Sequence, residues 1–208
     1  MGFSIASRAF GVTLAVSTLL LAGCGTADPR PSGDDWALPK KEQADAAMII
    51  GRIGMPPGDK DLELYGVVFV KEGGGYICGG TPCGEKAFAI NDYFVVPHLK
   101  PGVKYYFQGF STARVWHSLP VDYDKPIVLK PGQILFVGSH DYVKGKAGFL
   151  GPGSFGLQAS NKPSELDMLQ WLYGRSAGSG WEPIIANRIK ALGGKVAAAQ
   201  PAAPSDKK

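Results

Sequence analysis

The sequence predicts a mainly β protein: an antiparallel β-sandwich followed by a C-terminal helical hairpin. Short apolar, β-branched runs separated by turn residues fill the middle of the chain, which has 29 glycines and 16 prolines in all. No helical pattern lies between these runs, whereas a parallel β/α sheet needs helices as crossovers. Beyond residue 161 the spacing of the apolar residues becomes helical.

The predicted strands alternate with recognisable turns. The runs AMIIGRIG (residues 47–54) and LELYGVVFV (residues 62–70) flank the turn-rich MPPGDKD. Asn91-Asp92 predicts a turn or a bulge between two more strands, at 87–90 and 93–96. Lys100-Pro101-Gly102 predicts a tight turn, because proline presets φ and glycine takes a positive φ. Further strands are expected at 103–110, 113–119, 125–129, 132–143 and 149–158.

Two helices are predicted between residues 161 and 194. Ser164 followed by Asp167 predicts an N-terminal cap for the first helix. Pro183 in the first turn and Gly193 at the end delimit the second. Each helix has one apolar face, which we expect to pack on the sandwich or on the other helix. The faces consist of Leu166, Leu169, Leu172 and Tyr173, and of Ile184, Ile185, Ile189 and Leu192.

These patterns divide the chain into five segments. We expect a signal peptide at 1–23, a tether at 24–45, a β-sandwich at 46–160, a helical hairpin at 161–194 and a disordered tail at 195–208. The tether is predicted because prolines and aspartates are frequent there and periodicity is absent. The tail likewise lacks periodicity.

The N-terminal segment has the features of an export signal. Arg8 precedes an apolar run, Phe10 to Leu21, that is too short to span a bilayer of about 30 Å. The run ends in Leu21-Ala22-Gly23-Cys24, which resembles the lipobox of bacterial lipoproteins. The resemblance implies that Cys24 becomes the acylated first residue of the mature chain, held on a membrane by its acyl chains. Gly25 stands in place of the aspartate typical of inner-membrane retention, so we expect the outer membrane, on its periplasmic face or at the cell surface.

The two remaining cysteines are expected to form a structural disulfide. With Cys24 acylated, Cys78 and Cys83 remain as a pair in an oxidising compartment. Four residues separate them in a glycine-rich segment, and a ring of that size contributes roughly 2 kcal/mol. A redox pair and a metal knuckle are the alternatives, but the spacing is not Cys-x-x-Cys and no second Cys or His pair stands nearby in the sequence.

One segment suggests a particular kind of sandwich. The block DYFVVPHLKPGVKYYF (residues 92–107) resembles transthyretin-like sandwiches, above all the carboxypeptidase regulatory-like domains of bacterial envelope proteins. The matching residues are Leu99, Pro101, Gly102 and Tyr105 or Tyr106, and KPGQILFVG (residues 130–138) is similar to the penultimate strand. The resemblance covers about residues 47–145 and implies a scaffold, spacer or interaction module without catalytic residues. The immunoglobulin fold is the structural rival, but its Cys…Trp…Cys spacing is absent.

Motifs for chemistry are sparse. Residues 151–156 (GPGSFG) satisfy G-x-G-x-x-G, but the residues that follow fit a turn into a strand instead of the helix that a dinucleotide site needs. His98, His117 and His140 have no histidine partner at i+4. The aromatic residues around Tyr105 and Trp116 are expected to fill the core. The net charge of +4 comes from scattered lysines and predicts no nucleic-acid surface.

We therefore predict a non-enzymatic, lipid-anchored envelope protein that needs no cofactor. Its expected partners are the membrane, through Cys24, and another envelope protein, and its expected role is structural or in protein interaction. The alternative is a periplasmic lipoprotein that binds a small molecule or a metal through loops bearing His98, His117 and His140.

Overall fold

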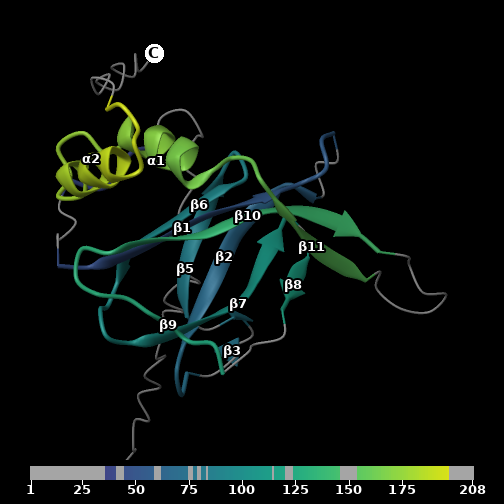
Figure 1. The fold of residues 1–208 in the computed structure, drawn as a ribbon. Helices are drawn as coiled ribbons and strands as arrows, with labels where there is room; N and C mark the ends of the chain where they lie inside the picture. Colours follow the sequence, from purple (N-terminus) through teal and green to yellow (C-terminus); the bar gives the residue numbers. More distant parts are fainter. Residues whose placement is uncertain are drawn as a thin grey trace, which may run out of the picture.

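The computed structural model describes residues 36–40, 45–58, 62–74, 77–78, 81–82, 84–113, 115–119, 124–145 and 154–196. Within these ranges the chain forms strands and two helices (Figure 1). Their bounds are β1 Ala47–Gly54, β2 Leu64–Lys71, β3 Ile77–Cys78, β4 Thr81–Pro82, β5 Glu85–Ile90, β6 Tyr93–Leu99, β7 Lys104–Thr112, β8 Trp116–Ser118, β9 Ile127–Val128, β10 Ile134–Lys144, β11 Phe155–Ser160, α1 Glu165–Tyr173 and α2 Glu182–Ala191.

The described strands form one large sheet and one small hairpin. The large sheet has the order β11-β10-β1-β6-β5-β2-β7-β8, with β9 also paired to β7, and β3 pairs with β4 separately. The large sheet folds over so that its two halves enclose an apolar core. The mainly β class and the two C-terminal helices are thus confirmed, and the arrangement is sandwich-like.

The expectation of purely antiparallel pairing is wrong at one place. β1 pairs with β10 in parallel, with Met48 opposite Ile134 and Ile50 opposite Phe136. The other pairs in the large sheet are antiparallel. An apolar run does not encode the direction of its neighbour, and these two strands lie far apart in the sequence. The direction of their pairing is therefore decided by the tertiary fold.

Strand β1 is buried on both faces and separates two cores. Ile49 and Ile53 face the interior of the folded sheet. Met48 and Ile50 point the other way, towards the helices. This explains why AMIIGRIG is almost continuously apolar, because a strand covered on both sides has no solvent face.

The two helices cover the outer face of β10, β1 and β6 as a third layer (Figure 1). The predicted cap is confirmed: the Asp167 N–H donates to Ser164 Oγ at 3.2 Å and the Ser164 N–H donates to Asp167 Oδ2 at 2.9 Å. The buried side chains of this layer come from both helices, from the three underlying strands and from segments beside them. They are Leu38, Met48, Ile50, Val95, Ile134, Met168, Leu169, Leu172, Trp181, Ile185 and Ile189.

Two predicted turns are present. Asn91 and Asp92 have φ values of 49° and 68° and join β5 to β6 as a two-residue hairpin. Asn and Asp tolerate this left-handed conformation better than other non-glycine residues. Gly102 has φ of 75° in the Pro-Gly turn before β7. Turn chemistry therefore sets these connections locally.

Part of the segment expected as a tether belongs to the fold. Leu38 is only 3% exposed, and its N–H donates to the Arg175 carbonyl at 2.8 Å. The Trp36 ring stacks on Trp171 with centroids 6.0 Å apart. Trp36 and Leu38 thus pack the start of the described chain against the helical layer. The burial of their apolar surface stabilises this contact.

Candidate functional site

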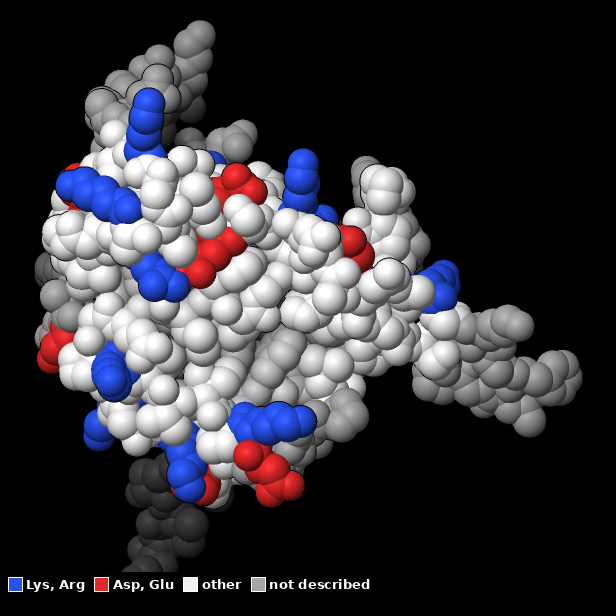
Figure 2. Space-filling view, viewed as in Figure 1, with Lys and Arg blue, Asp and Glu red and all other residues white. Residues whose placement is uncertain are grey.

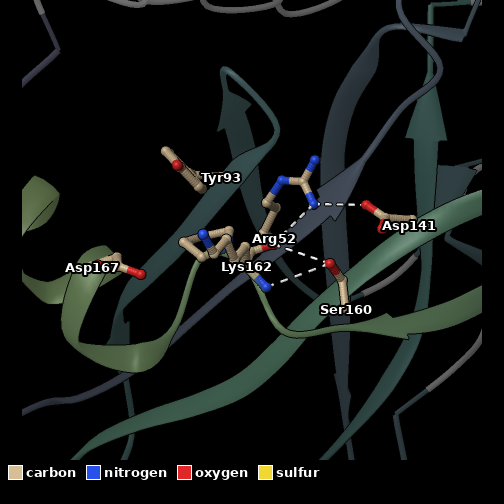
Figure 3. A pocket seen from close by; sticks show the side chains of 7 residues that line it. Arg52, Tyr93, Asp141, Ser160, Lys162 and Asp167 are labelled. Carbon is tan, nitrogen blue, oxygen red and sulfur yellow. Dashed lines mark hydrogen bonds and ion pairs between the residues drawn. The ribbon is translucent and has the colours of Figure 1, made fainter.

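An open cleft of about 510 Å³ lies where β1, β6, β10 and the connection from β11 to α1 meet (Figure 3). Its walls are mostly polar and come from segments far apart in the sequence. The lining residues are Arg52, Tyr93, Asp141, Ser160, Lys162, Pro163 and Asp167.

Arg52 is the centre of this cleft. Its side chain is 21% exposed, and its Nη1 donates to Asp141 Oδ1 at 2.8 Å and to the Lys162 carbonyl at 3.3 Å. Its Nη2 lies 3.7 Å from Asp92 Oδ2. One guanidinium therefore links β1 to β10, to the β5–β6 turn and to the segment that enters α1. Figure 3 draws its contacts with Asp141 and Lys162.

Gly54 makes room for this arrangement. A Cβ at Gly54 would collide with the Arg52 guanidinium, which lies across the strand at that point. The sequence contained a signal for this site, because Arg52 is the one charged residue in AMIIGRIG. A charged side chain in a strand buried on both faces needs partners. Arg52 was not among the site residues predicted from the sequence, and the identity of its partners depends on the fold.

The pKa values of the two carboxylates in the network are shifted in opposite directions. The hydrogen bond from Arg52 lowers the pKa of Asp141 below its ordinary value. Burial raises the pKa of Asp92, although the Met55 N–H and Arg52 oppose this rise. An ionised Asp141 held against a guanidinium is a weak base, so this pair is suited to joining strands and poorly suited to proton transfer.

Two serine hydroxyls in or beside the cleft also make hydrogen bonds. Ser160 Oγ donates to the Lys162 carbonyl at 3.2 Å, and Ser164 Oγ donates to Asp167 Oδ2 at 2.7 Å. Because these groups satisfy each other, the cleft is a structural junction of the fold in the part of the chain that is described.

The expectation that the three histidines lie on loops is wrong. His98 is in β6, His117 in β8 and His140 in β10. His98 Nε2 lies 3.7 Å from Glu85 Oε2 at an exposed position, whereas His117 is buried. Within the described ranges no three or more His, Cys, Asp or Glu side chains gather in a way that would hold a metal ion.

His117 belongs to an aromatic seam made of Phe110, His117, Tyr142 and Phe155. The His117 ring stacks on Phe110 with centroids 4.7 Å apart and meets the Phe155 ring edge-on at 4.9 Å. Tyr142 and Phe155 come from β10 and β11, so the seam joins the two ends of the large sheet by ring contacts. His117 Nε2 is buried and has no hydrogen-bond partner among the described residues.

The seam predicts a pH-dependent stability. Burial lowers the pKa of His117 from its usual 6.5, so the folded chain keeps a neutral imidazole where the unfolded chain takes up a proton. The stabilisation that comes from keeping His117 neutral is therefore fully present in the free energy of unfolding above pH 6.5. It is lost as the pH falls from 6.5 towards the lowered pKa of His117. We expect His117→Phe to abolish the part of the fall in unfolding free energy below pH 6.5 that is due to His117.

The control for this prediction is His98→Gln, which changes an exposed histidine outside the seam and should leave the contribution of His117 in place. Chemical denaturation of both variants and the wild type between pH 5 and 8 measures the difference. If His117→Phe parallels the wild type over this whole range, the seam is not the source of any pH dependence.

The cysteines are largely beyond the part of the chain that the structure describes. Cys24 and Cys83 lie outside the described residues, as do residues 197–208 of the expected tail. The backbone of Cys78 is in β3, opposite Thr81 of β4. The predicted lipid attachment and the predicted Cys78–Cys83 disulfide therefore stay predictions.

The second candidate site is the edge of β10. Strand β11 pairs with Ser139 to Lys144, and among the described strands none pairs with Ile134 to Gly138 on the side away from β1. A groove of about 350 Å³ follows this open stretch. We call it the β10 groove; it is lined by Gly132, Gln133, Ile134, Leu135, Phe136, Glu165, Ile184 and Arg188.

Along this stretch of β10, the backbone N–H and C=O groups of successive residues point alternately towards β1 and away from it. The Met48 N–H donates to the Gln133 carbonyl at 2.9 Å, and Met48 lies opposite Ile134. In a parallel ladder this register directs the peptide groups of Leu135 towards β1 and those of Ile134 and Phe136 away from it. The β10 groove therefore offers backbone donors and acceptors beside apolar side chains.

The surface charge is mixed. Figure 2 shows Lys and Arg side chains interspersed with Asp and Glu on the face drawn. Several charged side chains of the described residues form ion pairs, such as Arg188 with Glu165 at 2.8 Å and Lys104 with Glu72 at 2.7 Å. Neither α1 nor α2 has the length and hydrophobicity that a membrane-spanning helix requires.

Comparison of the chain with protein-family models, with curated proteins and with solved structures finds no match.

Proposed function

We propose that this chain is a lipid-anchored protein of the bacterial outer membrane that acts as a non-enzymatic protein-interaction module. Its sandwich would be of the transthyretin-like kind, and a Cys78–Cys83 disulfide would close the segment that contains β3 and β4. The acyl chains on Cys24 would hold the domain at the membrane.

The observation that carries the interaction role is the open edge of β10. Its residues Ile134 to Val137 are apolar on both faces, and the peptide groups of Ile134 and Phe136 point away from β1. In the Arg52 cleft, by contrast, Arg52, Asp141 and Ser160 already make hydrogen bonds within the fold. A partner that pairs with the edge would gain backbone hydrogen bonds as well as apolar burial.

The contacts of Trp36 and Leu38 with the helical layer indicate on which side of the domain the tether to the membrane would begin. The predicted lipid is on Cys24, so the linking segment would leave the domain beside α1 and α2. The eleven residues between Cys24 and Trp36 would span at most about 40 Å when extended. The domain would therefore stay close to the membrane, with its helical side next to the tether.

The anchor is tested by Cys24→Ser in cells that process lipoproteins. We expect the wild-type chain to incorporate a labelled palmitate and to remain with the membranes after a high-salt wash, and Cys24→Ser to do neither. Cys78→Ser is the matched control, because it removes a cysteine without touching the lipobox and should keep both the label and the membrane association. Equal palmitate labelling of Cys24→Ser and the wild type would contradict the proposal.

A further inference from the structure

The place beside the first half of β10 is a vacant strand position. Strand β11 runs along Lys144 to Ser139 and the chain then turns away at Ser160 into α1. Among the described strands, none continues in the position of β11 beside Ile134 to Gly138. Five residues of extended chain measure about 17 Å, so the vacancy has the length of an ordinary strand.

The sequence along the vacancy is that of a central strand. Ile134 and Phe136 pack towards the helices, and Leu135 and Val137 pack towards the interior of the sheet. Edge strands of monomeric proteins are usually protected by charges, proline or bulges. Residues 134–137 contain no charge and no proline, and the irregular pairing comes only after Ile50 and Phe136. An edge of this composition is expected to be covered.

We propose that the strand covering β10 is β10 of a second copy of this chain, paired antiparallel about a two-fold axis through Leu135. In this register Ile134 of one copy faces Phe136 of the other, and each such pair exchanges its two N–H···O bonds. These are the two residues whose peptide groups point outwards. The pairing is thus self-complementary in its hydrogen bonds, which an isologous interface requires.

Charge does not oppose this pairing. The wall of the β10 groove carries one carboxylate, Glu165, and one guanidinium, Arg188, which pair with each other at 2.8 Å. Two copies therefore meet without an excess of either sign at the groove. The apolar wall residue Ile184 would lie over the incoming strand and exclude water from its backbone.

The membrane anchor favours a second copy over an unrelated strand. The two-fold axis of an antiparallel pair stands perpendicular to the sheet, so the helical layers of both copies lie on the same side. Trp36 and Leu38 are fastened to that layer, so both tethers would leave towards one membrane. This step rests on the proposed anchor, and confinement to a membrane would raise the local concentration of the two copies.

A cysteine at the two-fold axis tests the proposal in the full chain. Leu135 of the two copies would form a non-hydrogen-bonded pair with Cα atoms about 4.5 Å apart, which suits a disulfide. We expect Leu135→Cys to give a covalent dimer in isolated membranes that reductant reverses. Val137→Cys, on the same face of the same strand, would be too far from its counterpart and should behave like the wild type.

A second pair of variants measures association without a crosslink. Phe136→Pro removes the outward N–H, whereas Phe136→Ala removes the same ring and keeps that donor. Light scattering of the purified full chain in detergent should give a dimer for the wild type and for Phe136→Ala, and a monomer for Phe136→Pro.

Three outcomes overturn the proposal: a monomeric wild type, equal crosslinking of Leu135→Cys and Val137→Cys, or a Leu135→Cys adduct with a different protein. The last outcome would remove the second copy and leave the proposed interaction role in place. Palmitate labelling at Cys24 is read separately, so failure of the anchor and failure of the dimer are distinguishable.

Discussion

Replacing Trp181 with alanine should lower the free energy of unfolding by about 4 kcal/mol. Trp181 is fully buried between the helices and the outer face of β1, in the cluster that also contains Leu38 and Met48. Removal of the indole would leave a cavity that the flanking helices cannot fill, because Met168 and Leu172 are already packed. Urea denaturation followed by circular dichroism measures the change.

Leu192→Ala is the control for this variant. Leu192 follows α2 and is 38% exposed, so its truncation should change the unfolding free energy by no more than about 0.5 kcal/mol. A loss below about 1 kcal/mol for Trp181→Ala would mean that the helical layer contributes little to the stability of the domain.

Replacing Arg52 with methionine should cost about 2 kcal/mol, the second large effect. Methionine keeps most of the aliphatic volume but removes every polar contact of the guanidinium. Asp141 and the Lys162 carbonyl lose a hydrogen bond, and the half-buried Asp92 loses its cationic neighbour. The effect should decline at low pH, because the lowered pKa of Asp141 means that its stabilising charge is present above pH 3.8 and is lost as the pH falls below it.

Two further variants check the origin of this loss. Arg188→Met breaks a single ion pair, with Glu165, made by an arginine that is more exposed than Arg52, and should cost at most about 0.5 kcal/mol. Gly54→Ala should destabilise in the same direction as Arg52→Met, because its methyl group would displace the guanidinium. If Arg52→Met and Arg188→Met lose equal stability, the network at the cleft contributes no more than a surface ion pair.

Elements whose signals are local were predicted well. The run at residues 47–54 is β1, and the Asn91-Asp92 turn joins two strands because both residues accept a positive φ. The Ser164 cap begins α1 because its side chain and that of Asp167 satisfy backbone groups that the helix leaves open. Each of these depends on residues within a few positions of one another.

Features that depend on distant residues were not predicted. The parallel pairing of β1 with β10 joins segments more than eighty residues apart, and neither segment specifies the other's direction. Arg52 was visible as a charge in an apolar strand, but Asp92, Asp141 and Lys162 meet it only through the fold. The expectation that His117 and His140 lie on loops conflicted with the strands predicted at 113–119 and 132–143, and β8 and β10 confirm those strands.

The sequence by itself determined the β-rich class, the turns and the two helices. The signals for these features are the spacing of apolar residues, the helix caps and the turn residues, and each involves residues only a few positions apart. It also predicts the lipid anchor at Cys24, because the lipobox is a pattern of four consecutive residues. Only the tertiary structure decided that Ile134 to Val137, a run suited to the middle of a sheet, lies at an edge. Whether a strand is central or lateral depends on which distant segments pair with it, and no local pattern contains that information.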